Sequence, residues 1–189
     1  MLGSSRSKIA GHLCRIWPAR LARRFAKQQD GAAAVEFALV AVPFLGLVFA
    51  ILETALVFFA GQTLETAVQD SARLIMTGQA QSQGWNKDQF KTQVCARIHG
   101  LFDCVNGVYV DVKTYNNFGA IDTTPPLTSG NFDDTKLQYS PGGVGSIEVV
   151  TLYYQWPIYV TLLGNGLSNL SNNKRLLIAT AVFRNEPYE

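Results

Sequence analysis

The sequence is poor in the residues that most enzyme and metal sites require. Of its 189 residues only two are histidine and three are cysteine. His12 and Cys14 lie in the first 31 residues, and His99 is expected on the polar side of a helix. No nucleophile elbow, phosphate-binding loop or metal-ligand motif occurs in the chain. We therefore expect a protein that is not an enzyme and that has no cofactor and no metal.

Acidic residues are nearly absent from the beginning of the chain. Residues 1–31 contain seven Lys and Arg and one acid, Asp30, for a net charge of +6. Residues 32–189 contain nine Lys and Arg and thirteen acids, for a net charge of −4. The basic character belongs to this leader, and no basic patch with interleaved aromatic residues follows it. Nucleic acid is therefore not an expected partner.

Charged side chains are also absent from residues 37–52, and after Glu53 the chain remains mostly apolar to Ala60. The hydrocarbon core of a bilayer is about 30 Å thick and takes about 20 helical residues. We therefore expect a transmembrane segment at residues 32–60, with Pro43 tolerated inside it. A secretory signal peptide would have a shorter apolar region, and the membrane span directly after the leader disfavours a mitochondrial transit peptide.

The charges that flank this segment predict its orientation. Lys and Arg are concentrated before it, which favours a cytoplasmic N-terminus and an external C-terminal part. Glu36 and Glu53 lie about 25 Å apart along a straight helix, so we expect them near the two faces of the membrane. The alternative for Glu53 is a role in an ion or proton relay.

The residues around Gly31 resemble a known processing site. Residues 30–37 read DGAAAVEF and resemble the prepilin-peptidase site of type IV pilins, with Glu and an aromatic residue fifth and sixth after the cut. The following residues 38–45 and 51–53, and more weakly the tail 181–188, resemble the TadE-like pseudopilins of the tight-adherence (Flp) pilus system.

This resemblance implies a function and a set of partners. It implies a minor pseudopilin that supports assembly of a tight-adherence pilus and is cut between Gly31 and Ala32 by a prepilin peptidase. The expected location is the bacterial inner membrane, with a periplasmic domain. Other pilins or pseudopilins and the pilus assembly platform are the expected partners. The alternative is an uncleaved single-pass protein whose periplasmic domain is a binding or sensory module.

Cleavage would give Glu36 a specific role. Ala32 would acquire a positively charged amine one helical turn from the Glu36 carboxylate. The resemblance implies that Glu36 and Phe37 form the subunit-pairing and processing motif, and pairing offsets the cost of a charge in a low-dielectric setting. In the alternative, an uncleaved anchor, Glu36 only marks the cytoplasmic face of the membrane.

Beyond the membrane, the spacing of apolar residues predicts that the helix continues through the segment 61–78. Its last helical residue is expected at about 77, because Gly78 is a residue type that commonly ends a helix. Its expected buried stripe consists of Leu56, Phe59, Ala60, Leu64, Ala67, Val68, Ala72 and Ile75.

Residues 79–189 are expected to form one periplasmic domain. After a polar linker at 79–84, Asn86 and Gln89 match a capping box that begins a second helix, with Phe90, Val94, Ile98 and Leu101 on its buried side. Strands are expected near 108–113, 147–154 and 176–183. Long polar loops separate them at 116–145 and 163–173.

Cys95 and Cys104 both fall in this external domain, and an oxidising compartment allows them to form a disulfide. A metal pair is the alternative, but it has too few ligands for zinc. The expected fold class is therefore α+β: a long N-terminal, pilin-like transmembrane helix followed by a small disulfide-bonded domain with a second helix and an antiparallel sheet.

Overall fold

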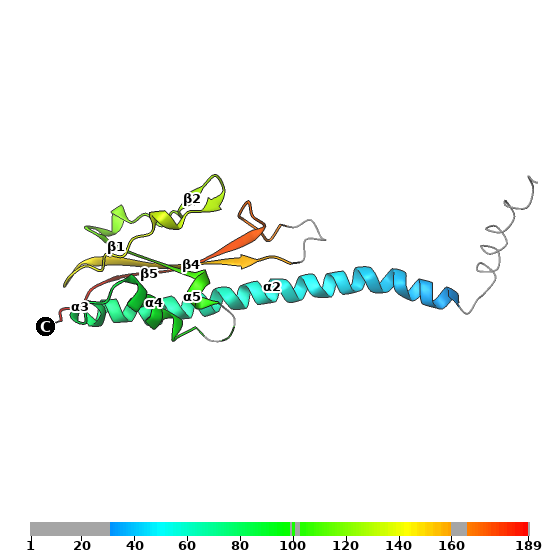
Figure 1. The fold of residues 1–189 in the computed structure, drawn as a ribbon, viewed down its shortest axis with the longest axis horizontal. Helices are drawn as coiled ribbons and strands as arrows, with labels where there is room; N and C mark the ends of the chain where they lie inside the picture. Colours follow the sequence, from blue (N-terminus) through cyan, green and yellow to red (C-terminus); the bar gives the residue numbers. More distant parts are fainter. Residues whose placement is uncertain (1–30, 99, 101–102, 160–165, 189) are drawn as a thin grey trace, which may run out of the picture. The chain divides into compact units, whose positions relative to one another are not determined.

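The computed structural model describes residues 31–98, 100, 103–159 and 166–188 (Figure 1). The predictions for the leader, for His99 and for Leu101 fall outside these residues. The chain divides into two compact units between Val48 and Phe49. This division falls inside a single helix, so the second unit contains the C-terminal part of that helix together with the whole domain that follows.

The long helix is α2, Ala32–Met76, close to the bounds expected from the sequence. Pro43 lies inside it without ending it. The helix stops before Gly78, whose φ of 75° is a left-handed conformation that glycine adopts without strain. A Cβ atom at Gly78 would lie 2.2 Å from Cγ of Tyr188, so glycine is required here for space as well as for backbone conformation.

The buried side of α2 differs from the predicted stripe at its beginning. Val57, not Leu56, begins the apolar buried series, and both Leu56 and Phe59 are exposed. The stripe predicted from Ala60 onward is confirmed. The buried residues of the helix are Glu53, Val57, Ala60, Leu64, Ala67, Val68, Ser71, Ala72 and Ile75. The steps of three and four fit either set of residues, and only the position of the sheet selects between them.

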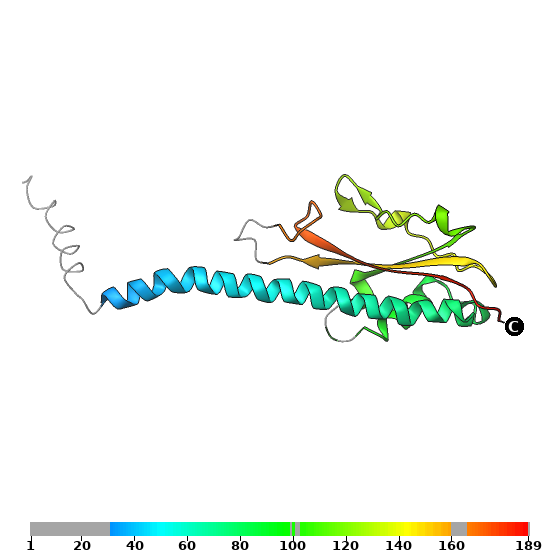
Figure 2. The same ribbon diagram turned by 180° about the vertical axis from the view of Figure 1, so that it is seen from behind.

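A three-stranded antiparallel sheet packs along this part of α2 (Figures 1 and 2). Its strands are β1 (Val108–Tyr115), β4 (Ile147–Pro157) and β5 (Lys174–Arg184), in the order β1-β4-β5. The register places Val110 opposite Leu152 and Leu152 opposite Ala179. These three side chains belong to the same buried cluster as Leu64 and Ile75 of α2. The main core therefore lies between one face of the sheet and the helix.

The two longest strands have different environments. Both are apolar on two faces, a pattern typical of a central strand or of a strand with one face covered by a helix. β4 is the central strand, and its residues Ile147 to Tyr153 are all buried. β5 lies at the sheet edge, and its Ile178 and Val182 are exposed.

The loop at 116–145 folds over the other face of the sheet and has structure of its own. It contains η2 (Phe118–Ala120), a hairpin of β2 (Leu127–Thr128) and β3 (Asn131–Phe132), and η3 (Asp134–Lys136). The ring of Phe132 lies 5.0 Å from that of Tyr109 and 5.2 Å from that of Tyr153, measured between centroids. Together with the buried Leu170 and Leu176, these rings form a second, smaller core.

Asp133, which follows β3, has three side-chain partners. Its carboxylate accepts hydrogen bonds from the hydroxyls of Thr128 and Thr135 and forms an ion pair with Lys136. The threonine hydroxyls lower the pKa of Asp133 to about 2.

Three short helices complete the domain. Residues Gln79–Ser82, expected to be a linker, form one helical turn, α3. The capping box predicted for the next helix, α4 (Lys87–Cys95), is present, with Asn86 and Gln89 bonded reciprocally. Ile98 is buried as expected but lies beyond the end of α4. A last short helix, α5 (Cys104–Gly107), precedes β1. The predicted α+β fold class is confirmed.

Candidate functional site

The residues of the predicted processing motif lie at the beginning of α2. Gly31 directly precedes the helix and is exposed, and among the described residues no atom outside its own neighbours in the chain lies within 4 Å of the position a Cβ would take. Ala32 is the first helical residue and Glu36 the fifth, so the two lie one turn apart on the same face. Glu36 and Phe37 are both exposed. The helix thus brings Ala32 and Glu36 together and leaves the peptide bond before Ala32 accessible.

Large apolar side chains are exposed along much of α2. They include Val35, Phe37, Leu39, Val40, Val42, Phe44, Leu45, Leu47, Phe49, Ile51, Leu52, Leu56, Phe58 and Phe59. Among the residues that the structure describes, α2 is the one helix long and apolar enough to cross a membrane, and its most apolar stretch is not buried by protein. A single N-terminal membrane anchor accounts for both observations.

Glu53, which interrupts the apolar part of α2, is buried against the domain and is not exposed like its apolar neighbours. It is only 6% exposed, and its Oε1 accepts a hydrogen bond of 2.5 Å from the backbone amide of Tyr159. Tyr159 follows the end of β4 by two residues, so the carboxylate connects α2 to that end of the sheet. The sequence predicts that Glu53 lies near a membrane face, but it does not reveal this partner, because the partner is a backbone group 106 residues away.

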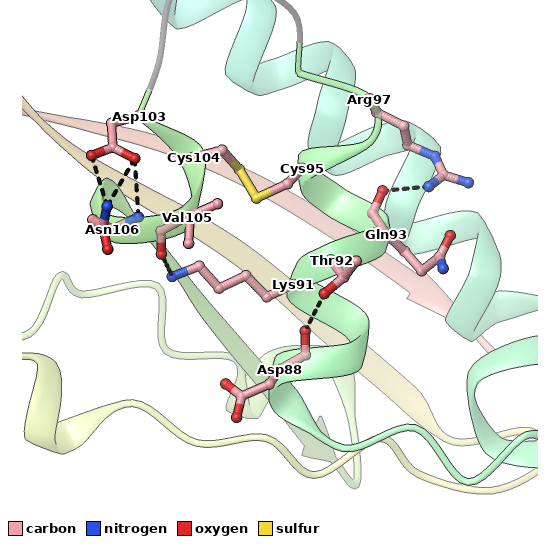
Figure 3. The surroundings of a disulfide bond; sticks show 10 residues. All are labelled: Asp88, Lys91, Thr92, Gln93, Cys95, Arg97, Asp103, Cys104, Val105 and Asn106. Carbon is pink, nitrogen blue, oxygen red and sulfur yellow. Dashed lines mark hydrogen bonds between the residues drawn. A yellow bond between two sulfur atoms is a disulfide. The ribbon is translucent and has the colours of Figure 1, made fainter.

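The predicted cysteine pair is bonded in the structure (Figure 3). Cys95 is the last residue of α4 and Cys104 the first of α5, with Cα atoms 5.6 Å apart. Beside the disulfide, Nζ of Lys91 donates a 2.7 Å hydrogen bond to the carbonyl of Val105. Partial burial lowers the pKa of Lys91. The Asp103 side chain caps α5 by accepting a hydrogen bond from the backbone amide of Asn106. The disulfide and these bonds fix α4 against the start of β1.

A buried carboxylate that the sequence did not single out lies on β4. Glu148 has no exposed surface. Its Oε1 accepts hydrogen bonds from the Gly142 amide at 2.8 Å and the Ser146 hydroxyl at 2.7 Å, and Thr114 donates from β1 at 3.1 Å. Burial raises the pKa of Glu148 despite these donors. These hydrogen bonds hold the end of the loop at 116–145 against the sheet.

Two further features bear on what the domain can bind. A groove of about 390 Å³ lies between α2 and β5, with Val57, Gly61 and Glu65 on the helix and Arg175 and Leu177 on the strand. In the described part of the chain, no three His, Cys, Asp or Glu side chains are grouped so that they could hold a metal.

Taken together, these features define a protein with a single apolar N-terminal anchor helix and a small disulfide-bonded α+β domain. Residues 31–73 match the family model described as TadE-like protein, which confirms the resemblance predicted from the sequence and indicates involvement in a tight-adherence pilus system. The matched segment begins at Gly31 and ends inside α2, so it does not include the sheet. No curated protein and no solved structure matches the chain.

Proposed function

We propose that this protein is a minor pseudopilin that supports assembly of a tight-adherence pilus. A membrane-embedded prepilin peptidase cuts it between Gly31 and Ala32. The mature chain then lies in the bacterial inner membrane through the N-terminal part of α2, with its N-terminus at the cytoplasmic face and its α+β domain in the periplasm. Other pilins or pseudopilins and the assembly platform are its partners.

The geometry around Gly31 carries this proposal. The glycine lies exposed at the boundary of α2, and no side chain of the described residues, its own chain neighbours aside, lies within 4 Å of the position its Cβ would take, so the peptide can enter a protease cleft here. The TadE-like match begins at this same residue. Glu36 lies one turn beyond Ala32, within reach of the amine that cleavage would create.

The proposed orientation follows from charge. The leader carries a net charge of +6, and the positive-inside rule retains such a segment in the cytoplasm. Cleavage would remove that charge after insertion, when it is no longer needed to set the topology. Glu36 and the new amine would then be the only charges near the cytoplasmic end of the span, since residues 37–52 have none.

The alternative function is a permanently anchored binding module. The groove between α2 and β5 favours it, because the groove combines apolar walls with Glu65 and Arg175. The two functions differ at the N-terminus, because only the pseudopilin requires removal of the leader.

Association with partners tests the pseudopilin role directly. Glu36→Ala should be processed normally and keep a folded domain, yet fail to co-purify with pilus-assembly partners. Asp70→Ala, which removes an exposed carboxylate farther along the same helix and outside the groove, is the matched control and should co-purify normally. Unchanged association of Glu36→Ala would contradict the pairing role and leave Glu36 as a marker of the membrane face.

A further inference from the structure

The exposed chemistry of α2 changes abruptly beyond Phe59. Up to that residue its exposed side chains are mainly large and apolar, including Leu56, Phe58 and Phe59. From Gln62 onward every exposed residue of the helix is polar or charged: Gln62, Glu65, Thr66, Gln69, Asp70 and Arg73. If α2 spans a bilayer, the transition from lipid to water falls between Phe59 and Gln62.

The end of β4 lies on the lipid side of that transition. The amide of Tyr159 is bonded to Glu53, so Tyr159 lies level with Glu53 along the helix. Glu53 precedes Phe59 by six residues, which is about 9 Å of helical rise. The Tyr159 side chain is 80% exposed although the preceding Ile158 is buried. A tyrosine at this level belongs to the interfacial region, where its ring and hydroxyl suit a partly apolar and partly wet surrounding.

The same end of the sheet is basic. Lys174 pairs with Pro157 across the two strands, and Arg175 follows it. The segments 154–159 and 166–176, which the structure describes at this end, contain these two cations and no acidic residue. The carboxylate of Glu53, which lies at this level of α2, is buried, and the exposed Glu65 lies twelve residues farther along the helix. Cations at this height complement the phosphate groups of anionic lipids.

We propose that the membrane-facing end of the sheet is a lipid-docking surface, in which Tyr159 inserts among the headgroups and Lys174 faces lipid phosphates. The proposal rests on the membrane span of the proposed function. The proposal also explains why the Glu53 carboxylate is buried. Because protein covers this carboxylate, the chain can enter the membrane interface to this depth without exposing the carboxylate to lipid.

The depth of a spin label on Tyr159→Cys tests this surface. The full-length chain, with Cys14→Ser and an intact Cys95–Cys104 disulfide, is placed in bilayers that contain phosphatidylglycerol. Labels on Phe44→Cys and Val144→Cys serve as references for the span and for an exposed apolar position on the loop before β4. Accessibility to oxygen and to a water-soluble nickel reagent is then measured for each label.

The label at 159 should be several-fold more accessible to oxygen than to nickel, and the label at 144 should show the reverse. A label at 159 as open to nickel as that at 144 would overturn the proposal. Protection of 159 from both reagents would also overturn it, because protein and not lipid would then cover the surface. If the label at 44 is open to nickel, the proposed span itself fails, so the two failures are distinguishable.

Discussion

The backbone amide of Tyr159 donates a hydrogen bond to the buried carboxylate of Glu53, across 106 residues of sequence. This bond connects the helix that carries the predicted processing motif to the sheet that forms the external domain. Val57 and Ala60 then pack against the core within the next two turns of the helix. Glu53 therefore marks where α2 changes from an exposed apolar helix to a packed one.

Removing the Glu53 carboxylate should destabilise the domain. Glu53→Ala leaves the Tyr159 amide without its acceptor, and a hydrogen bond to a charged group contributes about 1.5–3 kcal/mol. We expect a loss of that size in the free energy of unfolding, measured in detergent micelles by tryptophan fluorescence. Amide exchange at Tyr159 should also accelerate. The control Glu65→Ala removes an exposed carboxylate from the same helix, and an equal loss in both variants would contradict the account.

Replacing Gly78 should be costly for two reasons. Its φ of 75° is unfavourable for other residues by about 1–2 kcal/mol, and a Cβ would collide with the ring of Tyr188. Gly84 has a similar φ of 61° but open space around it. Gly78→Ala should therefore reduce the free energy of unfolding clearly more than Gly84→Ala does. Equal losses in denaturation experiments would show that Tyr188 does not confine this position.

The Cys95–Cys104 disulfide should stabilise the exported domain. Closing so short a loop contributes about 2–3 kcal/mol in the chain-entropy model. The double variant Cys95→Ser/Cys104→Ser should lose that amount, whereas Cys14→Ser in the leader should lose none. Thiol alkylation without reductant should modify neither cysteine of the wild-type domain. Complete labelling of both in freshly isolated envelopes would argue against the bond.

Glu148 should make the stability of the domain depend on pH. Its pKa in the folded state is raised above the ordinary value of 4.5 because the carboxyl is buried. The folded state therefore binds the proton more tightly than the unfolded chain does. The stability associated with the protonated form is fully present below pH 4.5 and is lost as pH rises through the folded pKa.

Comparison with Glu148→Gln measures this contribution. Relative to that variant, the wild-type free energy of unfolding should decrease as pH rises from about 4 toward neutrality. Glu65→Gln, at an exposed position, should follow the wild-type profile. A difference between wild type and Glu148→Gln that stays constant over this range would contradict the role assigned to burial.

Features encoded by neighbouring residues were predictable from the sequence. The α4 capping box requires only Asn86 and Gln89, three residues apart, and both bonds form. The stop of α2 at Gly78 follows from glycine's access to positive φ. The valines of β1 occur at every second position, which is the two-residue period of a β-strand. In each case the interaction is local, so no knowledge of the fold is needed.

Features that depend on distant parts of the chain were not predictable in the same way. Leu56 and Val57 are equally apolar, and only the sheet determines that Val57 faces the core. Glu148 is buried because the turn at 142–146 provides its donors, which no spacing in the sequence reveals. The β5 edge is apolar on both faces yet partly exposed, because strand order is a property of the whole sheet.

The mass of the N-terminal peptide of the protein isolated from its native host tests the central claim most directly. The account predicts a peptide that begins at Ala32 for the wild type. In Gly31→Val the branched side chain should block the protease cleft, so the precursor should keep its leader. A wild-type chain whose N-terminal peptide still contains the leader would contradict the pseudopilin function.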